Sequence, residues 1–140
     1  AAKPEARVVT PTAAAVIALK ALGARRISVL TPYTVETSRP MAEYFGAQGF
    51  AIDRFTCIGL TDDREMARIS HDDIVALASV AMSSESDALF ISCTAVRAAA
   101  VIARIEADHA VSAQGAPEVD WYVDAGGIAA ADGTDAGGVG

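Results

Sequence analysis

Residues 87–94 read Asp-Ala-Leu-Phe-Ile-Ser-Cys-Thr, a continuous apolar run that ends in small polar residues. A run this short and this apolar predicts a strand over residues 87–92 that is buried on both faces, as the strands of parallel sheets are. Cys93 and Thr94 would then form the turn into a helix, which we predict over residues 95–107. A strand followed by a helix is the repeating unit of an α/β fold.

The same alternation of strands and helices precedes this run. Apolar, β-branched stretches predict strands, and helical periodicity with capping residues predicts helices. Gly23 and Gly49 end the first two helices, and Ser70-x-x-Asp73 resembles the capping box of a third. The expected strands are residues 7–9, 26–30 and 50–58, the expected helices are residues 13–22, 35–48 and 74–82, and residues 59–65 are expected to form a polar connection.

Four such units predict one flavodoxin-like α/β domain over residues 1–111. Right-handed crossovers would place helices on both faces of a parallel sheet of about four strands, giving a three-layer αβα sandwich. Beyond Val111 the periodicity stops, and residues 112–140 hold seven of the 11 glycines. We therefore expect residues 112–140 to be loop or disorder, or foreign to the domain's family, and to be dispensable for folding.

The composition suits a single buried core, because 52% of the 140 residues are hydrophobic. No run of about 18 apolar residues predicts a membrane span, and the first residues lack the basic head and apolar run of a signal peptide. Cys57 and Cys93 are too far apart for a metal knuckle and too few for a disulfide scaffold. We expect a cytoplasmic protein with free thiols.

The charge of the chain argues against a nucleic-acid-binding surface. The net charge is −7, and all 11 basic residues lie in residues 1–104 together with 11 of the 18 acids. The body is therefore neutral, and the segment from residue 105 onward carries the excess. Neither a nucleic acid nor a membrane is an expected partner.

Candidate site residues follow from the predicted sheet, since ligands of open parallel sheets bind beyond the carboxyl ends of the strands. Cys93 lies at a predicted strand-to-helix turn, where the free N–H groups of the helix would favour a thiolate. A buried cysteine is also an ordinary small apolar residue, so this position alone leaves a packing role open. The other residues on this rim are Thr10, Thr12, Thr31, Tyr33, residues 59–61, Ser92 and Thr94.

Other reactive side chains are less favoured. Cys57 lies inside a predicted strand, so we predict that Cys93 is the more reactive thiol. Tyr33 suits a substrate carboxylate and the packing of an edge ring equally well. Arg97 could bind an anion or face solvent. The two histidines stand apart, and no spacing of metal ligands occurs.

Phosphate chemistry is disfavoured by the absence of its motifs. Low-molecular-weight tyrosine phosphatases need C-x5-R, whereas Cys93 and Arg97 give C-x3-R. Neither glycine loop of the nucleotide-binding folds, G-x-G-x-x-G or G-x4-G-K-[ST], is present.

Two segments carry a resemblance to a known family. Residues 31–36 read Thr-Pro-Tyr-Thr-Val-Glu, and residues 89–98 read Leu-Phe-Ile-Ser-Cys-Thr-Ala-Val-Arg-Ala. Both are similar to the maleate cis-trans isomerase and arylmalonate decarboxylase branch of the Asp/Glu racemase superfamily, and the match is nearest to its ectoine-utilisation protein A group. Residues 8–12 and 21–27 also fit, so the resemblance covers about residues 6–108.

The resemblance implies two similar αβα domains that face each other across a cleft, each giving one cysteine to a carboxylate substrate. One thiolate removes a proton or adds to a double bond, and the other thiol delivers a proton, without cofactor or metal. Cys93 matches the second cysteine, while Thr10, Tyr33 and Thr94 match positions near the bound acid. The family's first domain, with its own cysteine, is not in these 140 residues, so it is an expected partner.

Two departures from the family pattern stand out. Ser38 occupies a position where many members have asparagine, and a Gly/Ala/Asp-rich tail replaces the family's last strand. The chain therefore looks like a fragment, whose activity in isolation is doubtful.

The favoured hypothesis is a cofactor-independent, cysteine-dependent isomerase or racemase of a small carboxylic acid, acting in ectoine degradation. A decarboxylase of substituted malonates with the same thiol is the alternative enzyme. A non-catalytic flavodoxin-like binding domain is the alternative of another class. Self-association into a homo-oligomer is left open.

Overall fold

The computed structural model describes residues 9–112, 120–123 and 127–129. Within these ranges the strands form one sheet in the order β2-β1-β3-β4-β5, in which β1 to β4 run parallel and β5 pairs antiparallel with β4. This confirms the α/β class, and the order is that of the flavodoxin-like folds. The strands are β1 (Arg26–Thr31), β2 (Ala51–Cys57), β3 (Ala88–Ile91), β4 (Asp120–Val123) and β5 (Gly127–Ala129).

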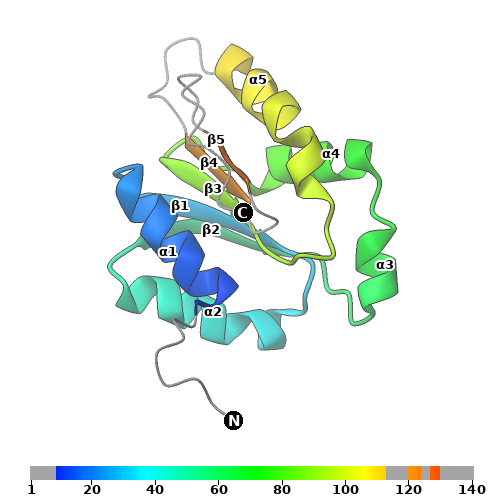
Figure 1. Ribbon diagram of the computed structural model, residues 1–140, viewed down its shortest axis with the longest axis horizontal. Helices are drawn as coiled ribbons and strands as arrows, with labels where there is room; N and C mark the ends of the chain where they lie inside the picture. Colours follow the sequence, from blue (N-terminus) through cyan, green and yellow to red (C-terminus); the bar gives the residue numbers. More distant parts are fainter. Residues whose placement is uncertain (1–8, 113–119, 124–126, 130–140) are drawn as a thin grey trace.

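Helices cover both faces of the sheet, as the predicted three-layer sandwich requires (Figure 1). Two helices, α1 (Pro11–Ala21) and α2 (Val35–Ala47), lie on one face. The short helix α3 (Asp63–Ala67) lies on the opposite side with α4 (His71–Ala81) and α5 (Ile102–Ser112).

Capping residues explain where three of these helices begin. The Oγ1 atom of Thr10 accepts a hydrogen bond from the backbone N–H of Ala13 at 3.2 Å, and Thr34 caps α2 in the same way. Ser70 accepts from the N–H of Asp73 at 3.1 Å and donates to its carboxylate at 2.7 Å, so Ser70 is confirmed as the N-cap, with a side-chain contact in place of the reciprocal backbone bond of a capping box. Gly23 ends α1 with a φ of 75°, which glycine adopts without strain.

A separate apolar core lies against each face of the sheet. On the side of α1 and α2, the rings of Phe45 and Phe90 meet edge to face with centroids 5.4 Å apart. On the other side, Leu89 and Ile91 pack against α4 and α5. All four residues of β3 are buried, which confirms the prediction from the apolar run.

Several sequence predictions differ from the structure in the part before residue 112. The helix predicted over residues 74–82 already begins at His71. The predicted strand at residues 7–9 lies mostly outside the described residues, and Val9 is in no strand. The expected polar connection at residues 59–65 contains the start of α3, because Asp62 caps the N–H of Arg64 at 2.8 Å. The helix predicted over residues 95–107 begins later, since residues 94–97 form a turn and a 3-10 helix (Ala98–Val101) precedes α5.

The expectation of loop or disorder after Val111 is wrong at residues 120–123 and 127–129. β4 pairs with the outer edge of β3, in the register Leu89 to Trp121, and β5 pairs with β4. A buried strand needs partners for its backbone groups on both edges, and here a segment distant in sequence supplies them. The remaining residues of 113–140 lie outside the described part, so the domain boundary at residue 111 stays a prediction.

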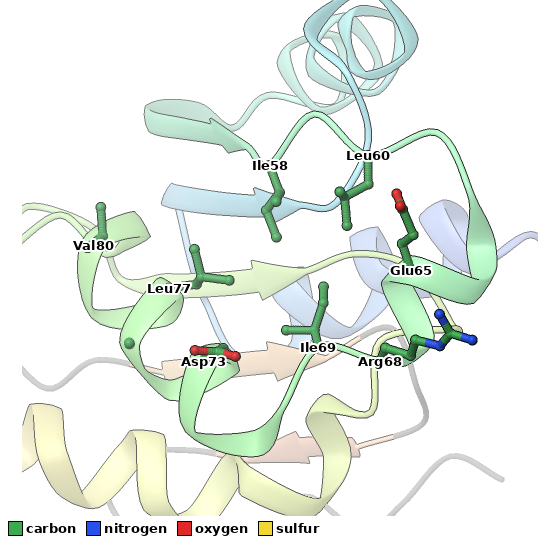
Figure 2. A pocket seen from close by; sticks show the side chains of 9 residues that line it. Ile58, Leu60, Glu65, Arg68, Ile69, Asp73, Leu77 and Val80 are labelled. Carbon is green, nitrogen blue, oxygen red and sulfur yellow. The ribbon is translucent and has the colours of Figure 1, made fainter.

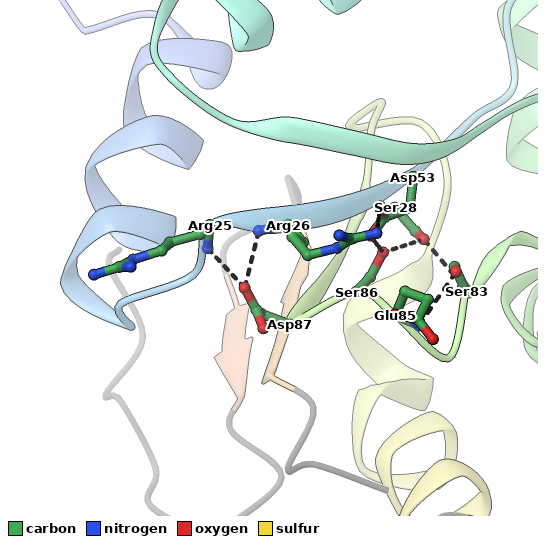
Figure 3. A network of polar contacts seen from close by, with 8 residues as sticks. All are labelled: Arg25, Arg26, Ser28, Asp53, Ser83, Glu85, Ser86 and Asp87. Carbon is green, nitrogen blue, oxygen red and sulfur yellow. Dashed lines mark hydrogen bonds and ion pairs between the residues drawn. The ribbon is translucent and has the colours of Figure 1, made fainter.

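A polar network joins the amino ends of β1, β2 and β3 (Figure 3). Asp53 on β2 accepts from the guanidinium of Arg26 at 2.5 Å and from the hydroxyl of Ser86 at 2.7 Å. The Ser86 hydroxyl lies 2.9 Å from that of Ser28 on β1, and Asp87 accepts from the backbone N–H of Arg26 at 2.9 Å. These polar groups are hydrogen-bonded to one another, so we assign the network a structural role at this edge of the sheet.

Asp53 gives this network a pH dependence. Burial raises the pKa of Asp53, but the hydrogen bonds from Ser86 and Arg26 outweigh that effect and hold it below its ordinary value. A lowered pKa stabilises the fold above the ordinary carboxyl value of about 4, and this stabilisation is lost as the pH falls through the lowered value.

We therefore expect Asp53→Asn to lower the free energy of unfolding near neutral pH and to differ less from the native chain in acid. Urea unfolding at a series of pH values measures this, with the exposed Glu43→Gln as the matched control. A constant difference between Asp53→Asn and the native chain down to the lowest pH would contradict it.

Candidate functional site

The carboxyl ends of β1, β2 and β3 meet at one edge of the sheet, where backbone hydrogen bonds hold the following loops together. The N–H of Ile58 donates to the carbonyl of Thr31 at 2.9 Å, and that of Leu60 donates to Pro32 at 2.8 Å. The N–H of Ser92 donates to the carbonyl of Leu30 at 2.9 Å. The loops after the three strands therefore form one connected rim.

Cys93 stands directly beyond β3 in a strained backbone conformation. Its φ is 90°, and it is the one non-glycine residue of the described chain with a positive φ. Such a conformation costs of the order of 1–3 kcal/mol, and strain of this kind clusters at functional sites. Its side chain is 6% exposed, and the thiol donates to the thioether of Met66 with the two sulfurs 3.8 Å apart.

The reason given by the sequence for a reactive Cys93 does not apply in this structure. Residues 94–97 are not helical, so no helix begins directly after the thiol. Cys57, the last residue of β2, is half-buried and more exposed than Cys93. The prediction that Cys93 is alkylated in preference to Cys57 therefore loses its basis. From the exposure of the two residues we expect Cys57 to be alkylated faster than Cys93.

The predicted substrate-binding residues fall into two groups. Tyr33 is half-buried and packs against the apolar cluster that contains Cys93, and Thr94, the next residue after Cys93, is exposed. Thr10 begins α1 on the opposite face of the sheet, where its hydroxyl caps the helix. The structure thus places Tyr33 and Thr94 with Cys93 and gives Thr10 a capping role, while contact of any of them with a substrate stays a prediction.

An open apolar groove of about 610 Å³ runs from the loop after β2 and helix α3 along helix α4 to Val80 (Figure 2). Glu65 and Arg68 stand at its α3 end, and Asp73 stands on α4. A small internal gap of about 10 Å³, lined in part by Ser92, shares Ile58, Ile69 and Leu77 with this groove. The apolar lining residues of the groove are Ile58, Leu60, Ile69, Ala76, Leu77 and Val80.

The sequence reasoning missed Met66, which contacts the candidate thiol. It is 2% exposed, although it lies in a stretch of polar residues. The available signal was the spacing of Met66 and Ile69, two apolar residues three positions apart in an otherwise polar segment. In the part of the chain that the structure describes, no group of three or more His, Cys, Asp or Glu side chains could hold a metal ion.

The comparison with protein families decides the classification. The family model for arylmalonate decarboxylase matches residues 3–133. The chain belongs to the arylmalonate decarboxylase family. The match continues through most of the segment after Val111 that we expected to be loop or foreign sequence.

Relatives with known activities agree with this membership. A maleate isomerase of Nocardia farcinica (strain IFM 10152) is 34% identical over 89 residues, which is 64% of this chain and 36% of that protein. A mutant of the Nocardia farcinica maleate cis-trans isomerase, solved with a covalently bound succinylcysteine intermediate, gives a TM-score of 0.66 at 27% identity, over 81% of this chain and 44% of its own.

A further solved structure shares the fold. The maleate isomerase Iso from Pseudomonas putida S16 gives a TM-score of 0.71 at 19% identity, over 81% of this chain and 44% of its own. The chain thus spans less than half the length of these relatives. No helix among the described residues has the length and apolar character that crossing a membrane requires.

Proposed function

We propose that the protein supplies one half of a cofactor-independent, cysteine-dependent isomerase of a small carboxylic acid, with Cys93 as its reacting group. The observation that carries this proposal is the strained Cys93 directly beyond β3 in a chain of the arylmalonate decarboxylase family. A positive φ in a cysteine is retained only when the surrounding structure enforces it. The maleate isomerase among the relatives supports a dicarboxylic acid such as maleate as substrate.

The chemistry needs two groups that exchange protons or bonds with the substrate. A succinylcysteine is what results when a thiolate adds to one carbon of maleate's double bond and a proton reaches the other carbon, and such an adduct is the intermediate held by the Nocardia relative. Rotation about the central carbon–carbon bond, which is now single, followed by loss of the same proton and expulsion of the thiolate, gives fumarate. We propose that one cysteine forms the C–S bond and that the other holds the proton.

Cys93 suits the proton-holding role in this scheme. Its sulfur lies 3.8 Å from the Met66 thioether, a contact that a protonated thiol can make as a weak donor. We propose that Tyr33 and Thr94 hold a carboxylate of the substrate by hydrogen bonds beside the thiol. The Thr10 hydroxyl accepts from the N–H of Ala13, so it would bind the acid by donating its own hydrogen, which requires the start of α1 to face the substrate.

The other cysteine must come from outside these 140 residues, because Cys57 ends the edge strand β2 and is separated from β3 by β1. We propose that the remaining half of the full-length protein supplies it, in a second domain across a cleft. More specific proposals are that the protein racemises a small amino acid or acts in ectoine breakdown. The sequence resemblance is the support for both. A homo-oligomer stays open.

The isolated 140-residue chain is therefore expected to show almost no conversion of maleate, whereas the full-length protein should convert it. Proton NMR of fumarate formation and of solvent deuterium incorporation measures both. Substantial turnover by the isolated chain would contradict the two-cysteine scheme and leave Cys93 to act alone.

A decarboxylase of aryl-substituted malonates is the second candidate function, favoured by the description of the matching family. It would use the Cys93 proton to quench the carbanion that forms as CO2 leaves. Release of CO2 from phenylmalonate without maleate turnover would select it over the isomerase.

A further inference from the structure

Helix α3 is attached to the domain by one side chain of its own and by one apolar residue on each side. Met66 is its one buried residue, whereas the other residues from Thr61 to Arg68 are exposed. Leu60 and Ile69 are partly buried against the same cluster, so the exposed segment between these two anchors is held to the cluster by Met66. A segment of this kind can open while the sheet stays folded.

Met66 also lies directly on the candidate reacting group. Its sulfur is 3.8 Å from the sulfur of Cys93, and both residues belong to the same buried cluster. A reacting carbon must approach the thiol to about 3–3.5 Å. Cys93 is only 6% exposed, so a substrate cannot reach the thiol while α3 and Met66 stay in this position.

The apolar groove offers space for the displaced side chain. Glu65, Arg68 and Ile69, which surround Met66 in sequence, line this groove of about 610 Å³ (Figure 2). An unbranched thioether adapts to irregular apolar space with little loss of packing. Moving Met66 from the cluster into the groove would expose the thiol and keep the thioether against apolar side chains.

We propose that α3 is a cover over Cys93, held closed by Met66, which acts as a positioning residue for the thiol. Opening moves Met66 toward the groove and admits the acid substrate, and closing excludes water from the reacting group. This inference rests on the proposed function for the role of Cys93 in catalysis, but the accessibility of the thiol can be measured without any turnover.

The experiment is alkylation of the 140-residue chain with iodoacetamide, followed by peptide mapping of Cys93 and Cys57. We expect Met66→Ala to speed the modification of Cys93 by about tenfold or more, because truncation releases the cover. Met66→Leu, which keeps the bulk, should stay within about threefold of the native rate. Arg64→Ala, an exposed change on the same helix, should have no effect, and the rate at Cys57 should be equal in all variants.

Equal rates at Cys93 in the native chain and in Met66→Ala would overturn the proposal. If Met66→Ala speeds the modification of Cys57 as much as that of Cys93, a second measurement distinguishes local from global opening. In it, the native chain is alkylated at several urea concentrations below the unfolding transition. A Cys93 rate that rises with the full slope of global unfolding overturns the cover, and a nearly urea-independent rate supports it. Retained turnover of full-length Cys93→Ser would defeat the proposed function alone, since none of these rates depends on catalysis.

Discussion

Replacing Cys93 by serine in the full-length protein is expected to lower turnover of its carboxylic acid substrate by several orders of magnitude. The substitution keeps the shape of the side chain, but a serine hydroxyl is a far weaker acid than a thiol and a poor leaving group from carbon. Whether Cys93 forms the C–S bond or delivers the proton, the step through it becomes slow. Fumarate formation from maleate, or solvent deuterium exchange into the acid, measures the loss.

Cys57→Ser is the matched control, because Cys57 ends the edge strand and has no catalytic role in this scheme. We expect it to keep near-normal turnover. Near-normal exchange in Cys93→Ser would remove Cys93 from the mechanism and favour the binding-domain alternative. Far-UV circular dichroism separates loss of chemistry from loss of folding, since Cys93→Ser should retain the native spectrum while it loses activity.

Much of the fold was predictable because local sequence determined it. The run at residues 87–92 could be identified as a strand buried on both faces, since every residue in β3 is apolar. Ser70 marked the start of α4 because its hydroxyl bonds within four residues of chain. Gly23 marked the end of α1 for the same reason, as the positive φ is a property of that one residue.

The part of the site that depends on distant contacts was not predictable. The turn at residues 94–97 replaces the expected helix start, and Ala-rich sequence there gives no local sign of it. The burial of Met66 depends on its meeting Cys93, 27 positions away along the chain. The resemblance to a family singled out Cys93 as the candidate thiol, but only the structure showed that Met66 contacts it.

Ending the chain after Val111 is expected to destabilise it strongly, contrary to the sequence-based expectation that this segment is dispensable. Truncation removes β4, whose backbone pairs with Ala88, Leu89, Phe90 and Ile91. Those residues are buried while β4 is in place, so its removal would leave outward N–H and C=O groups of β3 without their strand partners. Each such group costs about 1–3 kcal/mol, and a few of them approach the whole stability of a small domain, about 5–15 kcal/mol.

Thermal and urea unfolding of the truncated chain measure this loss, and a chain ending after residue 129 is the matched control because it keeps both β4 and β5. The control should unfold like the 140-residue chain, whereas the chain ending at residue 111 should unfold at much lower urea or lack a cooperative transition. Equal stability of all three would mean that β3 does not need β4. If the loss occurs, the strand that presents Cys93 depends on the segment after Val111, and the candidate site cannot be produced from residues 1–111 alone.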